Sequence, residues 1–172
     1  FLSRKKSKTI SKGIISETIN QSLVERIMLY VRGNFFIPDA RKNWVSPSVE
    51  YLSGYISKEN IETIITTGPP HSLHLIGMHL KDKLGVKWVA DFRDPWTTIG
   101  YHKKLKLTKR SRKKHLFLEK SVLNSADQVI VTSFVTKTEF SEITNKPIDV
   151  ITNGYDYEPV NPVKLDTKFS LA

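Results

Sequence analysis

Four short runs rich in β-branched residues, separated by segments of helix length, constrain the fold of this chain more than any other feature. The runs are IETIITT (61–67), VKWVADF (86–92), QVIVT (128–132) and IDVIT (148–152). A continuous β-branched run such as 61–67 is typical of a strand buried on both faces. Because helical segments separate the runs, the pattern predicts an α/β fold: a Rossmann-like parallel sheet with helices on both faces.

Helix signals fill the segments around these runs. Ser46 followed by Pro47 indicates an N-cap and a first-turn proline, and Thr136 with Glu139 forms a capping-box pattern. Gly85 stops the apolar spacing of the segment before it. We therefore expect helices over 15–31, after Ser46, over 73–84, over 105–124 and from Thr136 onward.

Composition bounds the class of protein. The chain has 172 residues, of which 39% are apolar, and this is enough for one globular domain with a sizeable core. It has no cysteine, which excludes disulfides and thiolate metal sites and favours a reducing compartment. No run approaches the ~20 apolar residues of a membrane-spanning helix. The chain begins at Phe1 with no signal-peptide pattern, so we expect it to be a piece of a longer protein.

The formal charge of +10 is concentrated in two patches. Nine Lys or Arg residues and a single acidic residue, Glu119, lie between 102 and 120, and five more basic residues lie within 1–12. A basic helix of this density suits nucleic acid, an anionic membrane surface or an acidic substrate. Its solvent-facing members include Lys109, Arg110, Lys113 and Lys114. No zinc spacing, heptad or RNA-binding aromatic signature accompanies it, so nucleic acid is not the expected partner.

Polar, turn-rich segments follow all four predicted strands. They are TTGPPHS (66–72), DFRDPW (91–96), TS (132–133) and TNGYD (152–156). The carboxyl ends of parallel strands share one edge of the sheet, and open α/β sheets bind their ligands at that edge. The sequence therefore predicts a ligand site built from these four segments.

DFRDPW is the most charged of the four segments. Asp91, Arg93 and Asp94 are suited to acid–base work, or to holding a polar ligand with a guanidinium fork. In the alternative reading, an Arg–Asp pair only fixes the loop and Trp96 is a packing lid. The residues alone leave both readings open.

TTGPPHS is suited to an anion cradle at a helix N-terminus. Gly68 would allow close approach, and the amides after Pro70 would point at the ligand. His71, His74 and His79 lack the spacing and partners of a zinc site, so no metal is predicted. His71 is kept as a candidate ligand contact because it lies at the turn.

With these motifs placed, the sequence resembles the N-terminal domain of glycosyltransferase family 4, and within it the type found in bacterial surface-polysaccharide synthesis. The matching segments are PDAR..W (38–44), TTGPPHS..L (66–75), WVADFRDPW (88–96), ADQVIVTS (126–133) and VITNGYD (150–156). Many relatives carry a His-Glu-Pro-like segment where this chain has Arg93-Asp94-Pro95. The resemblance implies a retaining transferase of the two-domain GT-B architecture.

The resemblance also implies roles for individual residues. Asp94 and Arg93 would be catalytic, and Arg93 could also stabilise the leaving diphosphate. The substrate-binding residues would be Gly68, Pro69, His71, Ser72, Asp91 and Trp96. Asn153 and Gly154 would form the hinge toward a second domain. No cofactor is implied.

The expected domain organisation follows from the same resemblance. Residues 1–156 would be the Rossmann-like acceptor-side domain, without its first strand or strands, and 157–172 would be a linker and the start of an absent donor-binding domain. The chain alone would then be inactive. The expected partners are a nucleotide-sugar donor, a glycan or lipid-linked acceptor and an anionic membrane surface. The enzyme would be cytoplasmic, at the inner face of the cell membrane. The alternative function is a non-enzymatic basic α/β module that binds nucleic acid or another polyanion.

Overall fold

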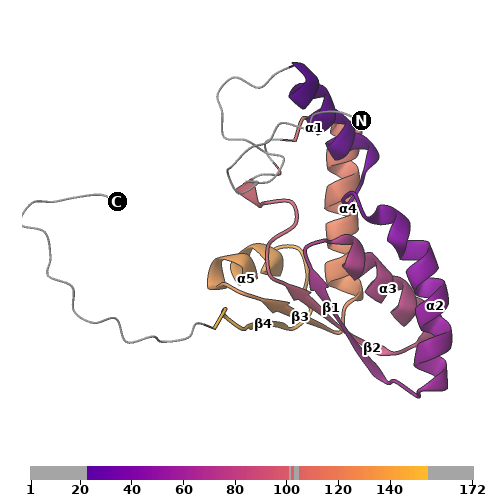
Figure 1. Cartoon of the computed structure of the whole chain (residues 1–172). Helices are drawn as coiled ribbons and strands as arrows, with labels where there is room; N and C mark the ends of the chain where they lie inside the picture. Colours follow the sequence, from indigo (N-terminus) through magenta and orange to yellow (C-terminus); the bar gives the residue numbers. More distant parts are fainter. Residues whose placement is uncertain (1–22, 101, 103–104, 155–172) are drawn as a thin grey trace, which may run out of the picture.

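A four-stranded parallel sheet forms the centre of the computed structural model, which describes residues 23–100, 102 and 105–154 (Figure 1). The strands are β1 (Thr63–Gly68), β2 (Lys87–Phe92), β3 (Gln128–Val131) and β4 (Ile148–Val150), and they lie side by side in the order β1-β2-β3-β4. Each of the four predicted strands forms within two residues of its predicted ends. The α/β, Rossmann-like parallel sheet is confirmed.

The connecting helices pack against one face of this sheet. Side chains that alternate along β2 and β3, among them Trp88, Phe92 and Val131, point into a core that they share with Val122 and Phe140 of the helices. When neighbouring strands follow one another in sequence, right-handed crossovers put every connecting helix on the same face.

The opposite face of the sheet is open in the described part of the chain. Ile65 in β1 is 66% exposed, and Ile151, just after β4, is 58% exposed. β1 therefore alternates between exposed and half-buried residues and is not buried on both faces. The β-branched composition of 61–67 predicted the strand, but the cover on its second face depends on elements outside this run.

The described residues form six helical segments (Figure 1). They are α1 (Leu23–Phe35), the short 3-10 helix η1 (Lys42–Trp44), α2 (Val45–Lys58), α3 (Ser72–Leu84), α4 (Lys109–Ser125) and α5 (Phe134–Ser141). The predicted helix over 15–31 is α1, which continues to Phe35. Its first part lies outside the described residues, as do the basic run 1–12 and the expected linker 157–172.

Side-chain caps explain where the observed helix ends differ from the predicted ones. α4 begins at Lys109 and not at Leu105, because the Thr108 hydroxyl accepts a hydrogen bond from the Ser111 amide at 3.1 Å. α5 is capped by Ser133, whose hydroxyl accepts from the Thr136 amide at 3.1 Å, so Thr136 is not the cap. α2 begins one residue before Ser46 without a side-chain cap.

The C-terminus of α3 forms as predicted. Gly85 has a φ of 70°, in the left-handed region that favours glycine, and its amide donates to the Lys81 carbonyl. Among the described residues, no helix is long and apolar enough to cross a membrane.

The segment before α4 is tied to α1. The Asn34 side chain donates to the Lys106 carbonyl at 2.8 Å and accepts from the Thr108 amide at 2.8 Å. Gly33 allows this close approach, since a Cβ there would come within 2.7 Å of the Leu107 side chain. The last turn of α1 is thereby held beside the start of α4, next to the carboxyl edge of the sheet (Figure 1).

Candidate functional site

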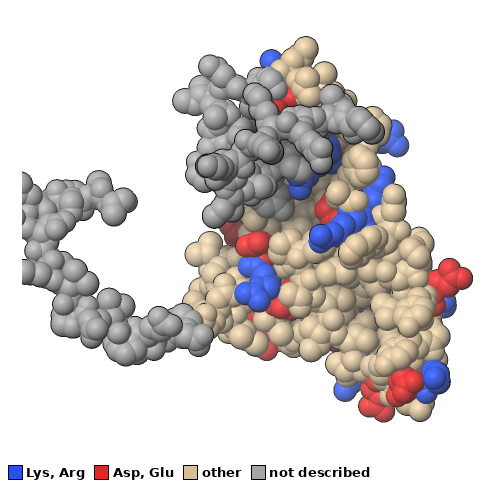
Figure 2. Space-filling model, in the orientation of Figure 1, with Lys and Arg blue, Asp and Glu red and all other residues tan. Residues whose placement is uncertain are grey.

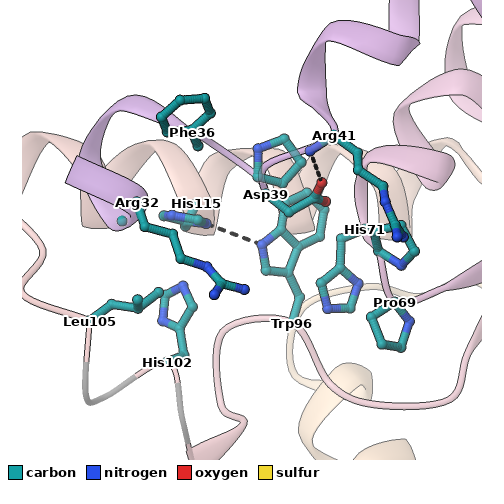
Figure 3. Close-up of a pocket in the computed structure, with 13 residues that line it drawn as sticks. Arg32, Phe36, Asp39, Arg41, Pro69, His71, Trp96, His102, Leu105 and His115 are labelled. Carbon is teal, nitrogen blue, oxygen red and sulfur yellow. Dashed lines mark hydrogen bonds between the residues drawn. The ribbon is translucent and has the colours of Figure 1, made fainter. Parts of the chain in front are cut away.

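Several of the predicted site residues line two neighbouring hollows at the carboxyl edge of the sheet, whereas Gly68, Ser72 and Asp94 line neither of them. Asp91, Arg93, Thr132, Asn153 and Gly154 line a shallow hollow and are called the edge cluster. The second group lines a cavity of about 300 Å³, called the histidine pocket (Figure 3). Its main polar and aromatic lining residues are Arg32, Asp39, Arg41, His71, Trp96, His102 and His115, and Pro69 forms part of its wall.

Arg93 is the centre of the edge cluster. Its amide donates to the Gly68 carbonyl at the end of β1 at 3.0 Å. The hydroxyl of Thr132, just after β3, donates to the Arg93 carbonyl at 2.9 Å. Nη2 of Arg93 donates to Oδ1 of Asn153, after β4, at 2.5 Å. One residue therefore links the ends of three other strands.

The carboxylates of DFRDPW are not used to fix the loop. Within the described ranges, Arg93 forms no salt bridge with Asp91 or Asp94; the ion pairs there include Lys58–Glu59 and Lys81–Asp127. The Asp94 side chain is exposed, and Asp91 is partly exposed on the open side of the sheet. The loop is held instead by the Arg93 backbone, so the Asp94 carboxylate remains accessible to a ligand.

The predicted anion cradle at the start of α3 already holds a carboxylate. Asp39 accepts hydrogen bonds from the Ser72 amide at 2.8 Å and from the Ser72 hydroxyl at 3.0 Å. Its Oδ1 also accepts from the Arg41 amide at 2.8 Å. Ser72 is 1% exposed, and both its amide and its hydroxyl donate to Asp39, while its contact with substrate stays a prediction. Sequence reasoning missed this role because Asp39 lies 33 residues before Ser72.

Packing explains the requirement for glycine at position 68. A Cβ on Gly68 would come within 2.5 Å of Nε2 of His74, which lies directly beneath the turn. His74 is held there by a chain of hydrogen bonds, in which Trp88 Nε1 donates to the Thr66 hydroxyl and that hydroxyl pairs with Nδ1 of His74, both at 2.9 Å. The indole is only a donor, so the Thr66 hydroxyl oxygen accepts its proton and uses its remaining hydrogen-bond capacity on Nδ1 of His74.

His71 is a buried residue in the wall of the histidine pocket. Its ring stacks on Trp96, with the centroids 5.0 Å apart and the planes at 3°, and neither ring nitrogen has a hydrogen-bond partner. Burial lowers the pKa of His71 to about 4, although Asp39 acts in the opposite direction. Trp96, which is 1% exposed, is both a wall of the pocket and part of the core.

His115 and His102 line the pocket from the side of α4. Trp96 Nε1 donates to Nδ1 of His115 at 3.2 Å, so Nε2 of His115 carries the proton, and this buried atom forms no hydrogen bond. Burial lowers the pKa of His115, and the nearby Gly33 carbonyl opposes this shift without completing a hydrogen bond. Burial, together with His115, also lowers the pKa of His102 to about 4.

Two arginines give the pocket a positive charge. Arg32, in the last turn of α1, points its guanidinium toward His102 and Trp96 (Figure 3). No carboxylate pairs with it in the part of the chain that the structure describes. Arg41 lies nearer the surface, with its guanidinium carbon 5.3 Å from the centre of the Trp44 ring. The sequence pattern indicated no role for Arg32, and it contained Arg41 only as the arginine of the matching segment PDAR..W.

Glu119 fixes the chain that follows DFRDPW. Its carboxylate accepts from the Thr97 amide at 3.0 Å and from the Thr97 hydroxyl at 2.5 Å. It is 1% exposed, and burial raises its pKa. The single acid of the basic segment therefore has a structural role in positioning Trp96 and its neighbours.

The predicted basic patch lies on the outside of α4. Lys109, Arg110, Lys113 and Lys114 are all exposed, and Arg110 and Lys114 line a hollow beside Lys42. In Figure 2 basic side chains are visible in the upper half of the view, the half that holds α1 and the start of α4. Across the described ranges, no group of three or more His, Cys, Asp or Glu residues is arranged to hold a metal ion.

A parallel sheet with polar loops gathered at its carboxyl edge defines the class of Rossmann-like ligand-binding domains. Comparison with family models narrows this class. Residues 14–159 match the model of Glycosyltransferase Family 4, and the chain belongs to this family. No curated protein and no solved structure matches the chain.

Proposed function

We propose that this chain forms the acceptor side of the cleft in a retaining glycosyltransferase of GT-B architecture. The enzyme would transfer a sugar from a nucleotide-sugar donor to a glycan or lipid-linked acceptor. The observation that carries the proposal is the family match over 14–159, which spans all four strands and both groups of site residues. The match does not support a non-enzymatic, nucleic-acid-binding module.

Two accessible side chains after β2 support catalytic roles: the exposed carboxylate of Asp94 and the guanidinium of Arg93 in the edge cluster. An unpaired carboxylate that follows a strand can accept a proton from an acceptor hydroxyl or hold a sugar hydroxyl. A guanidinium at the same edge can stabilise the negative charge that develops on a leaving diphosphate. Because Asn153 occupies only one of the nitrogens of Arg93, the rest of the fork remains available for this task.

The donor site belongs to a second domain in this proposal, joined to the chain after Asn153 and Gly154. Both residues lie at the end of the described sheet, beside Arg93. A change in the angle between the domains would thus act directly on a catalytic side chain. The exposed basic patch of α4 would hold the enzyme at the cytoplasmic face of a bacterial membrane, where a lipid-linked acceptor is found.

A transfer assay tests the proposal. The protein that joins this chain to its donor-binding domain is incubated with a panel of UDP-, GDP- and dTDP-sugars and a bacterial lipid extract. We expect one nucleotide sugar to label a lipid or glycan product, with the anomeric configuration of the donor retained in the product as judged by NMR. An inverted product would refute the retaining mechanism, and the absence of transfer from every donor would refute the proposed function.

A further inference from the structure

The histidine pocket has more hydrogen-bond donors than the protein uses. Nε2 of His115 carries a proton that completes no hydrogen bond, although the Gly33 carbonyl is nearby, and His71 and His102 each have at least one buried ring nitrogen without a partner. A buried donor that lacks an acceptor costs about 1–3 kcal/mol. Such a cost is recovered when a ligand supplies the missing acceptors.

The charges around these rings favour an anionic ligand. The Arg32 guanidinium has no carboxylate partner among the residues described, and a guanidinium is only a donor. Asp39 is the acidic residue in the lining, and its oxygens are already committed to the Ser72 and Arg41 groups. The pocket therefore offers a net positive charge and several N–H groups, the donor set that a phosphate oxygen prefers.

The size and position of the pocket limit what the anion can be. A volume of about 300 Å³ is at the lower end for small-molecule sites, which suits a phosphate or diphosphate group more than a whole nucleotide. DFRDPW separates this pocket from the edge cluster, since Arg93 lines one and Trp96 lines the other. An anion in the pocket would be held beside the catalytic edge but not at it.

We propose that the histidine pocket binds the phosphate or diphosphate group of the acceptor, with Arg32 as its charged anchor and His71, His102 and His115 as further donors. This inference rests on the proposed function and assigns the acceptor to the class of phosphate-bearing compounds. The group fixes the acceptor, so that its reacting hydroxyl lies over the edge cluster. The donor's own diphosphate is not the ligand of this pocket.

Ligand titration of the 172-residue chain by NMR tests the proposal. Pyrophosphate is added at constant ionic strength, and the ring signals of the histidines are followed. We expect the rings of His71, His102 and His115 to shift with a dissociation constant of about 1 mM or tighter, whereas the ring of the exposed His79 does not. Unmoved pocket rings in the wild-type chain would overturn the proposal, whatever the variants do.

Two matched variants test whether pyrophosphate binds in the histidine pocket or is attracted to basic residues in general. Arg32→Gln is expected to weaken pyrophosphate binding about tenfold or more, because it removes a charge-assisted contact. Arg110→Gln makes the same chemical change in the basic patch and should leave the dissociation constant within about twofold. An equal loss in both variants would overturn the assignment to the pocket.

Two further ligands test whether the pocket binds a phosphate group of the acceptor or of the donor. A sugar 1-phosphate should bind the pocket and shift the same rings, and UDP should bind no more tightly than pyrophosphate. UDP binding tighter than pyrophosphate by tenfold would assign the pocket to the donor and refute the proposal. Binding is measured without turnover, so a loss of sugar transfer with intact phosphate binding would count against the proposed function alone.

Discussion

Nη2 of Arg93 donates a hydrogen bond of 2.5 Å to Oδ1 of Asn153, and this bond joins the loop after β2 to the segment after β4. The two residues have different proposed roles, one in catalysis and one in the hinge toward the donor domain. If the segment after β4 moved with a second domain, as proposed, this contact would move the Arg93 guanidinium with it. The open or closed state of a two-domain enzyme would thereby be sensed at the carboxyl edge of the sheet.

Replacing Arg93 by lysine tests the guanidinium itself. An ammonium keeps the charge but cannot contact Asn153 and a phosphate oxygen in one plane, so we expect kcat of the two-domain enzyme to fall at least about tenfold. The change is at an exposed site, and the melting temperature should hardly move. Arg110→Lys in the basic patch is the matched control. Full activity of Arg93→Lys would show that the guanidinium is not needed for transfer, and that Arg93 acts only through the hydrogen bonds of its backbone.

The isolated chain can be used to test whether the nucleotide-sugar donor binds only in the second domain. If the donor site lies in the second domain, calorimetry of the 172-residue chain should detect no binding of UDP- or GDP-sugars in the micromolar range. Any association should be no stronger than that of pyrophosphate alone. Micromolar binding of an intact nucleotide sugar would contradict this division.

Charge reversal on α4 tests the membrane contact. Lys109→Glu with Lys113→Glu should weaken binding to phosphatidylglycerol vesicles at least about tenfold, since each basic residue near an anionic surface contributes about 1 kcal/mol. Lys83→Glu with Lys87→Glu makes the same change in charge on exposed residues away from α4, and should have a smaller effect. Equal losses in co-sedimentation would show that net charge, and not this patch, governs the binding.

The buried histidines predict that the fold loses stability in mild acid. The pKa of His71 is about 4 in the folded chain, below its ordinary value of 6.5, so the unfolded chain takes up this proton first. Its contribution is complete above pH 6.5 and is lost as the pH falls toward 4. At pH 5 we expect His71 alone to lower the free energy of unfolding by about 2 kcal/mol relative to pH 7.

Urea unfolding at the two pH values measures this loss. Glu119 has a raised pKa, and its contribution to stability falls as the pH rises through its titration range, so it does not produce the acid loss. His71→Asn should reduce the difference between pH 7 and pH 5, whereas His79→Asn, at an exposed position, should preserve it. Unchanged stability of the wild-type chain across this range would show that His71 is not held neutral by burial.

Local patterns were sufficient to predict the sheet. The four β-branched runs and the helical spacing between them are properties of neighbouring residues, and each of the four strands forms where predicted. The helix starts were less accurate because single hydroxyls decide them, as with Thr108 before α4 and Ser133 before α5. The open face of the sheet depends on the strand order, which no local pattern contains.

The site could be predicted only in part for the same reason. The edge cluster comes from the segments directly after strands, and the sheet topology brings them together. The histidine pocket instead joins Arg32 of α1, Asp39 of the following loop, His71 of the turn before α3 and His115 of α4. These residues lie far apart in the sequence, and His115 and Glu119 stand within a run whose dominant feature is its basic charge.

Asp94 is proposed to act in sugar transfer from the acceptor side of the cleft, and steady-state kinetics of Asp94→Asn in the two-domain enzyme would show whether it does. Asparagine keeps the shape and removes the charge of an exposed side chain, so the free energy of unfolding should change by less than ~1 kcal/mol. Asp82→Asn, at an exposed position in α3, is the matched control. We expect kcat to fall by roughly ten- to a thousandfold in Asp94→Asn only. Turnover of Asp94→Asn equal to that of the wild type would contradict it.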